Sequence, residues 1–108
     1  MNFKGYIISD AEEDIFNIYN YVLFNDSEEK AEYVLSKIEE MCLSLSKYPN
    51  RGHVPPEFER LGVYSYKEIH FKPYRIIYEV TESIVYIHCV LDGRRSLQEL
   101  LENRLLRR

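Results

Sequence analysis

The sequence lacks the features that mark secreted, membrane-bound and disulfide-rich proteins. It has no tryptophan and only two cysteines, Cys42 and Cys89, among its 108 residues. The cysteines show no Cys-x-x-Cys spacing, so we predict two small buried side chains in a reducing compartment. No apolar run approaches the roughly 18 residues of a membrane span, and the first residues show no signal-peptide pattern. We therefore expect a cytoplasmic protein that does not use a membrane.

Short motifs of catalysis and cofactor binding are also missing. The chain has neither a Gly-rich phosphate loop nor a nucleophile elbow. Its three histidines, His53, His70 and His88, are not at metal-ligand spacing. We interpret each histidine, taken singly, as a surface or half-buried residue, and we expect no metal and no cofactor.

Positive charge is scarce overall and unevenly distributed. The net charge is -4, and residues 10–40 carry ten acidic side chains against two lysines, a local charge of -8. Residues 60–75 carry four basic side chains against one acid, and residues 93–108 carry five against two, so each segment is +3. The acidic segment is typical of a solvated helix surface, whereas the basic segments favour an anionic partner. The acidic total argues against general coating of nucleic acid.

What the chain does have is enough apolar material for one folded domain. With 45% hydrophobic residues, it can bury a core without metals or disulfides, and we expect residues 1–108 to form a single domain. Its ten tyrosines make the apolar surface partly amphipathic, which suits interfaces as well as cores.

The first half predicts a strand followed by two helices. Residues 3–8 are typical of a short strand, and Ser9 with Glu12 predicts a capping box at the start of a helix. Residues 25–27 break that helix, and Asp26 with Glu29 is expected to cap the next one. So short a turn requires an antiparallel helical hairpin. The apolar stripes of the two helices are Ala11, Ile15, Ile18 and Val22, and then Ala31, Val34, Ile38, Met41 and Leu45.

The second half predicts three strands and a last helix. Proline and glycine punctuate residues 50–62, which we interpret as a loop. Residues 64–71, 74–80 and 84–91 are strand-like, and their short connections require an antiparallel meander. Ser96 to Glu99 repeats the capping-box pattern before a leucine-rich helix. The order β-αα-βββ-α predicts an α+β fold, with a small antiparallel sheet, an N-terminal helical hairpin on one face and a C-terminal helix.

Arginines on the predicted strands are the strongest candidates for a functional site. Arg75 alternates with Ile76, so it should lie on the sheet face that the hairpin leaves open. Arg94 and Arg95 follow the neighbouring strand, and Lys67 is a candidate for the same surface. Permanently charged guanidinium groups on rigid elements suit the binding of phosphate or carboxylate. The alternative is that Arg75 forms a structural cross-strand bridge with a glutamate, Glu68 or Glu79.

The closing helix carries a second candidate surface. Its apolar stripe is typical of a core-facing helix, but a terminal helix can also swing away and expose the groove beneath it to a partner's helix. The candidate residues for binding a target or partner are Leu97, Leu100, Leu101 and Leu105.

Taken together, these segments resemble the RelE/ParE superfamily of bacterial toxins, which includes plasmid stabilisation proteins. The resemblance spans nearly the whole chain, and its order and spacing agree with the predicted layout. The segments that carry it are Ala11-Glu12-Glu13-Asp14-Ile15, Pro49-Asn50-Arg51-Gly52, Val54-Pro55-Pro56-Glu57, Tyr66-Lys67-Glu68-Ile69, Pro73-Tyr74-Arg75-Ile76-Ile77-Tyr78 and Val90-Leu91-Asp92-Gly93-Arg94-Arg95.

The resemblance implies one of two targets. RelE-like members cut mRNA on the ribosome, and by their pattern Arg75, with Arg94 or Arg95 and Lys67, would stabilise the phosphorane. Their usual tyrosine or histidine near the C-terminus is absent here. ParE-like members instead inhibit DNA gyrase and need no catalytic acid or base. An acidic chain without an evident proton-transfer residue fits the second kind better.

Both kinds imply a cognate antitoxin whose disordered segment folds around the toxin. The resemblance is also compatible with a homodimer or a heterotetramer with the antitoxin. A third hypothesis is a degenerate, non-toxic member that survives only as an antitoxin-binding partner.

Overall fold

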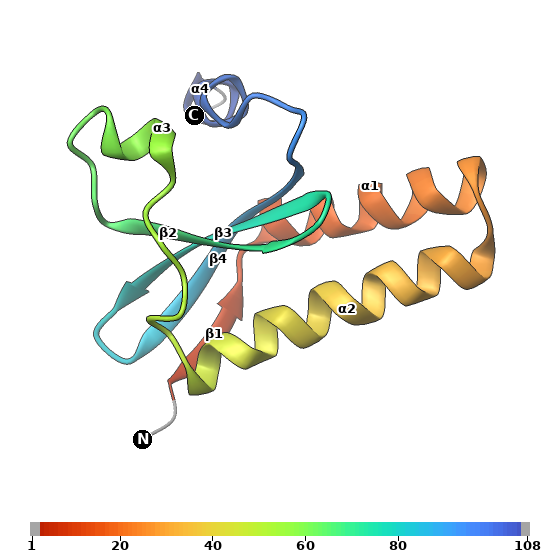
Figure 1. Ribbon diagram of the computed structural model, residues 1–108, viewed down its shortest axis with the longest axis horizontal. Coiled ribbons are helices and arrows are strands. Elements are labelled where there is room, and N and C mark those ends of the chain that lie inside the picture. The colour runs from red at the N-terminus through yellow and green to blue at the C-terminus, as the bar shows by residue number, and fades with distance from the viewer. Residues whose placement is uncertain (1–2, 107–108) are drawn as a thin grey trace.

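A computed structural model describes residues 3–106, with the side chains of residues 3–104. The chain forms a four-stranded sheet. Figure 1 shows the helical hairpin along one side of this sheet and the C-terminal helix on the other. The elements in chain order are β1 (Lys4–Ile7), α1 (Ser9–Asn25), α2 (Glu28–Lys47), α3 (Pro56–Glu59), β2 (Tyr66–Phe71), β3 (Tyr74–Thr81), β4 (Ile84–Asp92) and α4 (Leu97–Leu106). The predicted α+β layout is confirmed, with the short helix α3 added inside the predicted loop.

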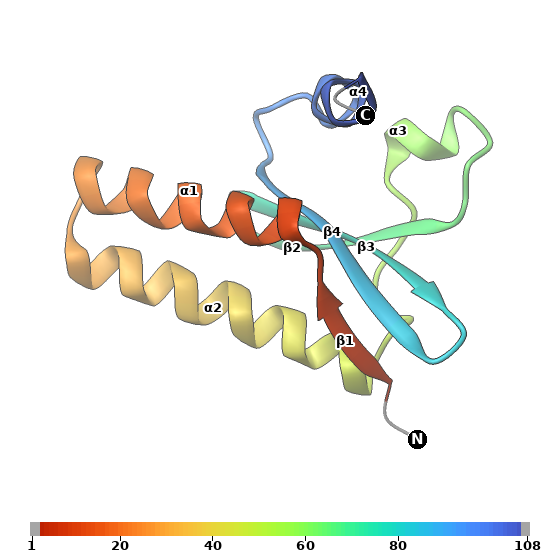
Figure 2. The same cartoon turned by 180° about the vertical axis from the view of Figure 1, so that it is seen from behind.

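The sheet has the strand order β1-β4-β3-β2 (Figure 2). The meander of β2, β3 and β4 is antiparallel as predicted, while β1 pairs with β4 in parallel and makes the sheet mixed. A parallel neighbour requires a long crossover, and the α1–α2 hairpin is part of it. Strand β1 is therefore an edge strand of the sheet, and its neighbour is β4.

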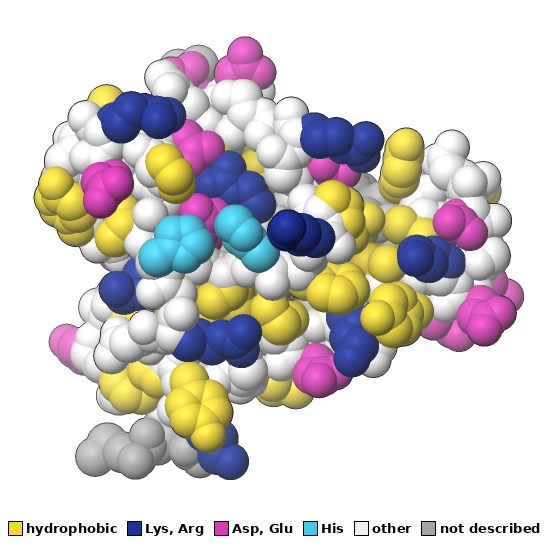
Figure 3. Space-filling model, in the orientation of Figure 1, with side chains coloured by type: hydrophobic (Ala, Val, Ile, Leu, Met, Phe, Trp, Pro, Cys, Tyr) yellow, Lys and Arg dark blue, Asp and Glu magenta, His cyan; other side chains and the backbone are white. Residues whose placement is uncertain are grey.

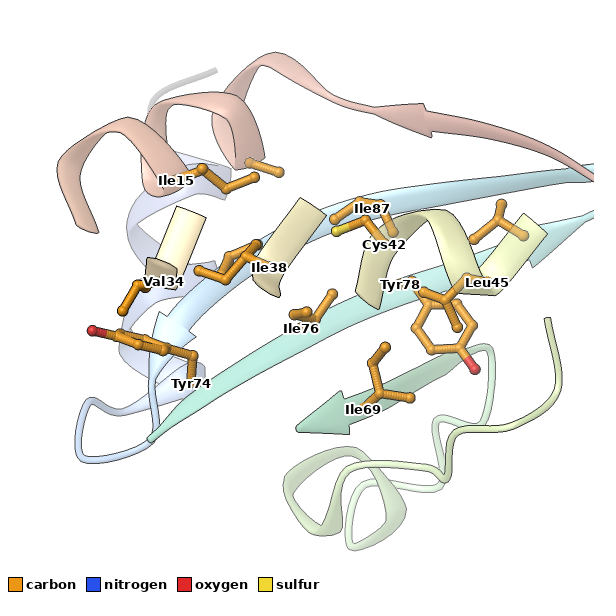
Figure 4. Packing of buried hydrophobic residues seen from close by; sticks show 13 residues of the cluster. Ile15, Val34, Ile38, Cys42, Leu45, Ile69, Tyr74, Ile76, Tyr78 and Ile87 are labelled. Carbon is orange, nitrogen blue, oxygen red and sulfur yellow. The ribbon is translucent and has the colours of Figure 1, made fainter. Parts of the chain in front are cut away.

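The larger core lies between the hairpin and the sheet (Figure 4). Helix α1 contributes Ala11 and Ile15, and the sheet contributes Ile76 and Tyr78, all at or below 9% exposure. The predicted stripe of α2 is confirmed except that Met41 is only partly buried and Cys42 is buried in its place. The buried residues of α2 are Ala31, Val34, Ile38, Cys42 and Leu45.

A second, smaller core lies on the other face of the sheet. Ile77, Cys89 and Leu91 from the strands pack there with Leu97 of α4. Helix α3 joins this layer through Phe58, whose ring centroid lies 5.0 Å from that of Tyr66. The sheet is therefore covered on both faces, which agrees with its strands being apolar on both sides.

The helix starts show which capping predictions hold. Helix α1 begins without a side-chain cap, because its N-cap residue is Ile8, so the predicted Ser9 capping box is wrong. Ile8 follows the end of β1 and is still bonded to the sheet, because its amide donates to the Ile87 carbonyl at 3.1 Å. Helix α2 is capped by Ser27 rather than Asp26. At α4 the Ser96 half of the predicted capping box is confirmed, with the Glu99 amide donating to Ser96 Oγ at 3.2 Å.

Both cysteines are buried and free, as predicted. Burial raises the pKa of each thiol to about 12, so neither is a reactive thiolate at neutral pH. Among the described residues, no helix has the length and apolar character needed to cross a membrane.

Candidate functional site

Arg75 lies in the middle of an ion-pair cluster, not on an open face. Its Nη1 and Nη2 donate to the two oxygens of Glu57 at 2.7 and 2.9 Å, and its Nε donates to Glu68 Oε1 at 2.7 Å. The side chain is only 13% exposed. The expectation of an open face is therefore wrong, because α3 and α4 cover this side of the sheet. The alternative, a cross-strand bridge to Glu68, is what the structure contains.

Glu68 is the buried centre of this cluster, with 1% exposure. Besides Arg75, two imidazoles contact its carboxylate. His70 Nε2 lies 3.0 Å from Oε1, and His53 Nε2 lies 3.2 Å from Oε2. The two imidazole rings also touch edge to face, with centroids 5.6 Å apart, and Figure 3 shows two histidine side chains side by side on the molecular surface.

The backbone explains why these four side chains meet. His70 is the direct partner of Arg75 in the β2–β3 register, and Glu68 precedes His70 by two residues on the same face. His53 pairs with Glu68 as an isolated bridge, in which each amide donates to the other's carbonyl at 3.1 and 2.7 Å. His53, in the segment before α3, therefore extends the sheet by one residue beside β2.

Tyr78 fixes the segment that carries His53. Its buried hydroxyl donates to the Pro49 carbonyl at 2.8 Å and accepts from the Gly52 amide at 3.0 Å. A Cβ on Gly52 would lie 2.6 Å from both the Tyr78 hydroxyl and the Glu68 carbonyl oxygen, so only glycine fits this approach. The position of His53 is therefore set from the hairpin face of the sheet.

The charges of the cluster stabilise one another. Hydrogen bonds from Arg75 hold the pKa of Glu57 at about 2. Burial would raise the pKa of Glu68, but the hydrogen bonds from Arg75 and His70 lower it below its ordinary value. The hydrogen bond with Glu57, aided by Glu68, in turn raises the pKa of Arg75. The two carboxylates thus stay ionised at neutral pH and more than neutralise the guanidinium group.

The other predicted basic residues lie elsewhere. Arg94 is 80% exposed and binds Asp92 through Nε and Nη2 at 3.0 and 2.7 Å. Arg95 is exposed and lines, with Arg94, a groove of about 370 Å³ beside α1. Lys67 pairs in register with Tyr78, so it lies on the hairpin face, opposite to Arg75. The structure therefore does not bring Lys67, Arg75, Arg94 and Arg95 into one concave surface.

Helix α4 packs on the smaller core and, together with α3, lines a groove of about 470 Å³. Leu97 is 1% exposed, and Leu100 and Leu101 pack against the smaller core. The side chain of Leu105 lies outside the described residues. Arg104 anchors the helix, because its guanidinium group binds Asp14 of α1 and donates to the His88 carbonyl at 2.9 Å. Asp14 also accepts from the Val90 amide at 3.0 Å, so one carboxylate ties α1, β4 and α4 together.

The comparisons with known proteins agree with this architecture. A family model described as the ParE toxin of the type II toxin–antitoxin system parDE matches residues 7–97. The chain belongs to this family. It is therefore a toxin of the type II toxin–antitoxin class, and the resemblance found in the sequence is confirmed, including its ParE-like side. A search of the curated proteins found no match.

Two solved structures share the fold of this ParE-family toxin. The chromosomal ParDE system from P. aeruginosa superposes with a TM-score of 0.70 at 18% identity, over 83% of this chain and 95% of that chain. The RelBE2 toxin–antitoxin complex from Mycobacterium tuberculosis gives a TM-score of 0.62 at 15% identity, over 85% and 99%. At such identities the likeness concerns the fold alone.

Sequence reasoning missed most of the cluster around Arg75 in this toxin. His53 and His70 were judged singly, and 17 positions separate them in the chain. Glu57 lay in a predicted loop with no assigned partner. The one available signal was the alternation of Glu68 and His70 on the same face of a strand, two residues apart.

Proposed function

We propose that this toxin arrests growth by binding DNA gyrase, and that it does not cut mRNA. The observation that carries the proposal is the state of Arg75. This guanidinium group is 13% exposed and is held by two carboxylates. A cation that stabilises a phosphorane must face the substrate with unused hydrogen-bond donors. Here three of the five N–H donors, one each on Nε, Nη1 and Nη2, already go to glutamates.

The local charge supports the same choice. Arg75, Glu57 and Glu68 together carry a single negative charge, which repels a phosphate group. Arg94 and Arg95 are exposed, but they line a different groove, beside α1. Binding to a protein target requires neither a free catalytic cation nor a proton-transfer group, and the family match favours this mode.

A specific observation nevertheless favours a second candidate, the ribosome-dependent mRNA endonuclease. The sequence showed no proton-transfer group, whereas the structure places His53, Glu68 and His70 within hydrogen-bonding distance. Imidazoles beside a carboxylate can act as general acid and base. In that case an arriving phosphate would have to displace Glu57 from Arg75.

The two candidates are separated by two assays and one variant pair. Purified toxin is tested for inhibition of gyrase supercoiling and for mRNA cleavage on translating ribosomes. We expect inhibition of gyrase and no codon-dependent cleavage. The His70→Asn variant should inhibit gyrase like the parent. The control variant His88→Asn should do the same, because His88 pairs with Glu79 and lies outside the cluster around Arg75.

Two results would overturn the proposal. Cleavage of mRNA that is lost in His70→Asn and kept in His88→Asn would establish the endonuclease. If the chain, expressed without an antitoxin, causes no growth arrest, both toxic mechanisms fail and the degenerate-member hypothesis gains support.

We also propose a cognate antitoxin as partner. The predicted contacts at Leu97, Leu100, Leu101 and Leu105 require α4 to leave the smaller core, in which Leu97 is buried. Other apolar surface is already available, and aromatic residues are favoured at interfaces. The exposed large hydrophobic residues are Tyr6, Phe16, Tyr21, Phe24, Tyr33, Leu43, Tyr48, Leu61 and Tyr64. A homodimer or a heterotetramer with the antitoxin remains a prediction.

A further inference from the structure

We propose that His53, Glu68 and His70 form a binding site for a divalent transition-metal ion, with Zn²⁺ as the best-fitting occupant. The candidate ligand atoms, one from each side chain, all lie within 4.8 Å of one another. Imidazole nitrogen and carboxylate oxygen are ligands that Zn²⁺ accepts, and two histidines with one glutamate make a known type of zinc ligand set. The inference is independent of the toxin's target.

The ligand atoms lie near the spacing that tetrahedral coordination needs. Metal–ligand bonds of about 2.0–2.2 Å place neighbouring ligands of a tetrahedral zinc ion about 3.4 Å apart. The Glu68 carboxylate already lies close to both imidazoles, with Oε1 3.0 Å from His70 Nε2 and Oε2 3.2 Å from His53 Nε2. An ion would lie between these atoms, and binding would draw one Glu68 oxygen and the two Nε2 atoms, now within 4.8 Å of one another, to about 3.4 Å.

The ligands are also held in place by what surrounds them. Arg75 Nε donates to Glu68 Oε1 at 2.7 Å, which orients the carboxylate and leaves Oε2 directed at His53. Partners of this kind orient the ligands of metal sites, although the positive charge of Arg75 also lowers the affinity for a cation. The backbone bridge between His53 and Glu68 fixes two of the three ligands relative to each other.

Access to the site is open on one side. The side chains of His53 and His70 are 62% and 44% exposed, while Glu68 is 1% exposed. An ion can therefore enter from solvent and keep a water molecule or an external ligand in the fourth position. Because His53 precedes α3 and the other two ligands belong to β2, the ion would tie the 49–53 segment to the sheet.

The test is Zn²⁺ binding to tag-free protein that has first been stripped with a chelator. We expect one ion per chain by calorimetry, a rise in Tm on adding ZnCl2, and the visible absorption of tetrahedral Co²⁺ when cobalt is used instead. His53→Asn and His70→Asn should each weaken binding at least about tenfold and abolish the cobalt bands.

His88→Asn is the matched control. In the parent, His88 Nε2 also lies 3.0 Å from a carboxylate oxygen, but that oxygen belongs to Glu79, outside the proposed metal site. This variant should bind Zn²⁺ like the parent. Circular dichroism of each variant checks that it is folded. We expect His53→Asn and His70→Asn to fold like the parent, because both imidazoles are exposed. Absence of stoichiometric binding to the parent, or equal binding by the parent and the His53 and His70 variants, would overturn the proposal.

Discussion

At the scale of single residues, the ion-pair cluster around Arg75 depends on side chains that the neighbouring elements hold in place. Arg75 and Glu68 come from adjacent strands, but their geometry is completed by Glu57 from α3 and His53 from the segment before it. Arg75 and Glu68 are largely removed from water, at 13% and 1% exposure, so each needs its charged partner. A change at one residue is therefore expected to propagate to the others.

Tyr78→Phe should destabilise the fold by about 1–3 kcal/mol, the usual cost of leaving buried polar groups unpaired. The substitution removes the donor to the Pro49 carbonyl and the acceptor for the Gly52 amide. Urea denaturation measures the effect. Tyr64→Phe, at a residue that is 63% exposed, should change stability by less than about 0.5 kcal/mol. Equal stability of the two variants would contradict the role of the Tyr78 hydroxyl.

Glu57→Gln should flatten the dependence of stability on pH in the acid range. The pKa of Glu57 falls from an ordinary 4.5 to about 2 in the folded chain, so protonation favours the unfolded chain. This stabilisation is complete above pH 4.5 and is lost as the pH falls toward 2. Urea midpoints across this range should drop less in Glu57→Gln than in the parent. Glu59→Gln, an exposed position on the same short helix, should behave like the parent.

At the scale of elements, an irregular strand and an anchored helix shape the second face of the sheet. A register shift between Ile77 and Tyr78 leaves His88 as an extra residue on β4. Because of this bulge, Ile87 packs on the hairpin side, while Cys89 packs under α4. Strict alternation along β4 would have put both on one face.

Arg104→Ala should release α4 from the sheet. The pair with Asp14 has side-chain exposures of 14% and 11%, so its loss should cost between the about 1 kcal/mol of an exposed pair and the about 3–5 kcal/mol of a buried one. Hydrogen exchange should accelerate in the amides of α4 more than in those of α2.

The Asp14→Ala/Arg104→Ala double variant provides the control. If the pair itself matters, the double variant should be more stable than the sum of the two single losses implies. Unchanged exchange in α4 after Arg104→Ala would show that Leu97 and its neighbours are sufficient to hold the helix.

At the scale of the whole molecule, the sheet is the middle of three layers. The hairpin buries one face and α3 with α4 buries the other (Figures 1 and 2). This arrangement turns an arginine expected on an open surface into part of an enclosed ion-pair cluster. It also leaves aromatic side chains on the outside of the hairpin, where a protein partner can reach them.

The antiparallel meander, the helical hairpin, the toxin family and every helix and strand except α3 could be predicted from the sequence alone. These follow from local periodicity and turn chemistry, and from segments such as the one around Arg75, all of which are readable along the chain. The folded structure was needed to show which face α4 covers, that β1 joins in parallel, and that His53 lies beside Glu68. Those are contacts between residues far apart in sequence, fixed by packing and by a bulge that local patterns do not encode.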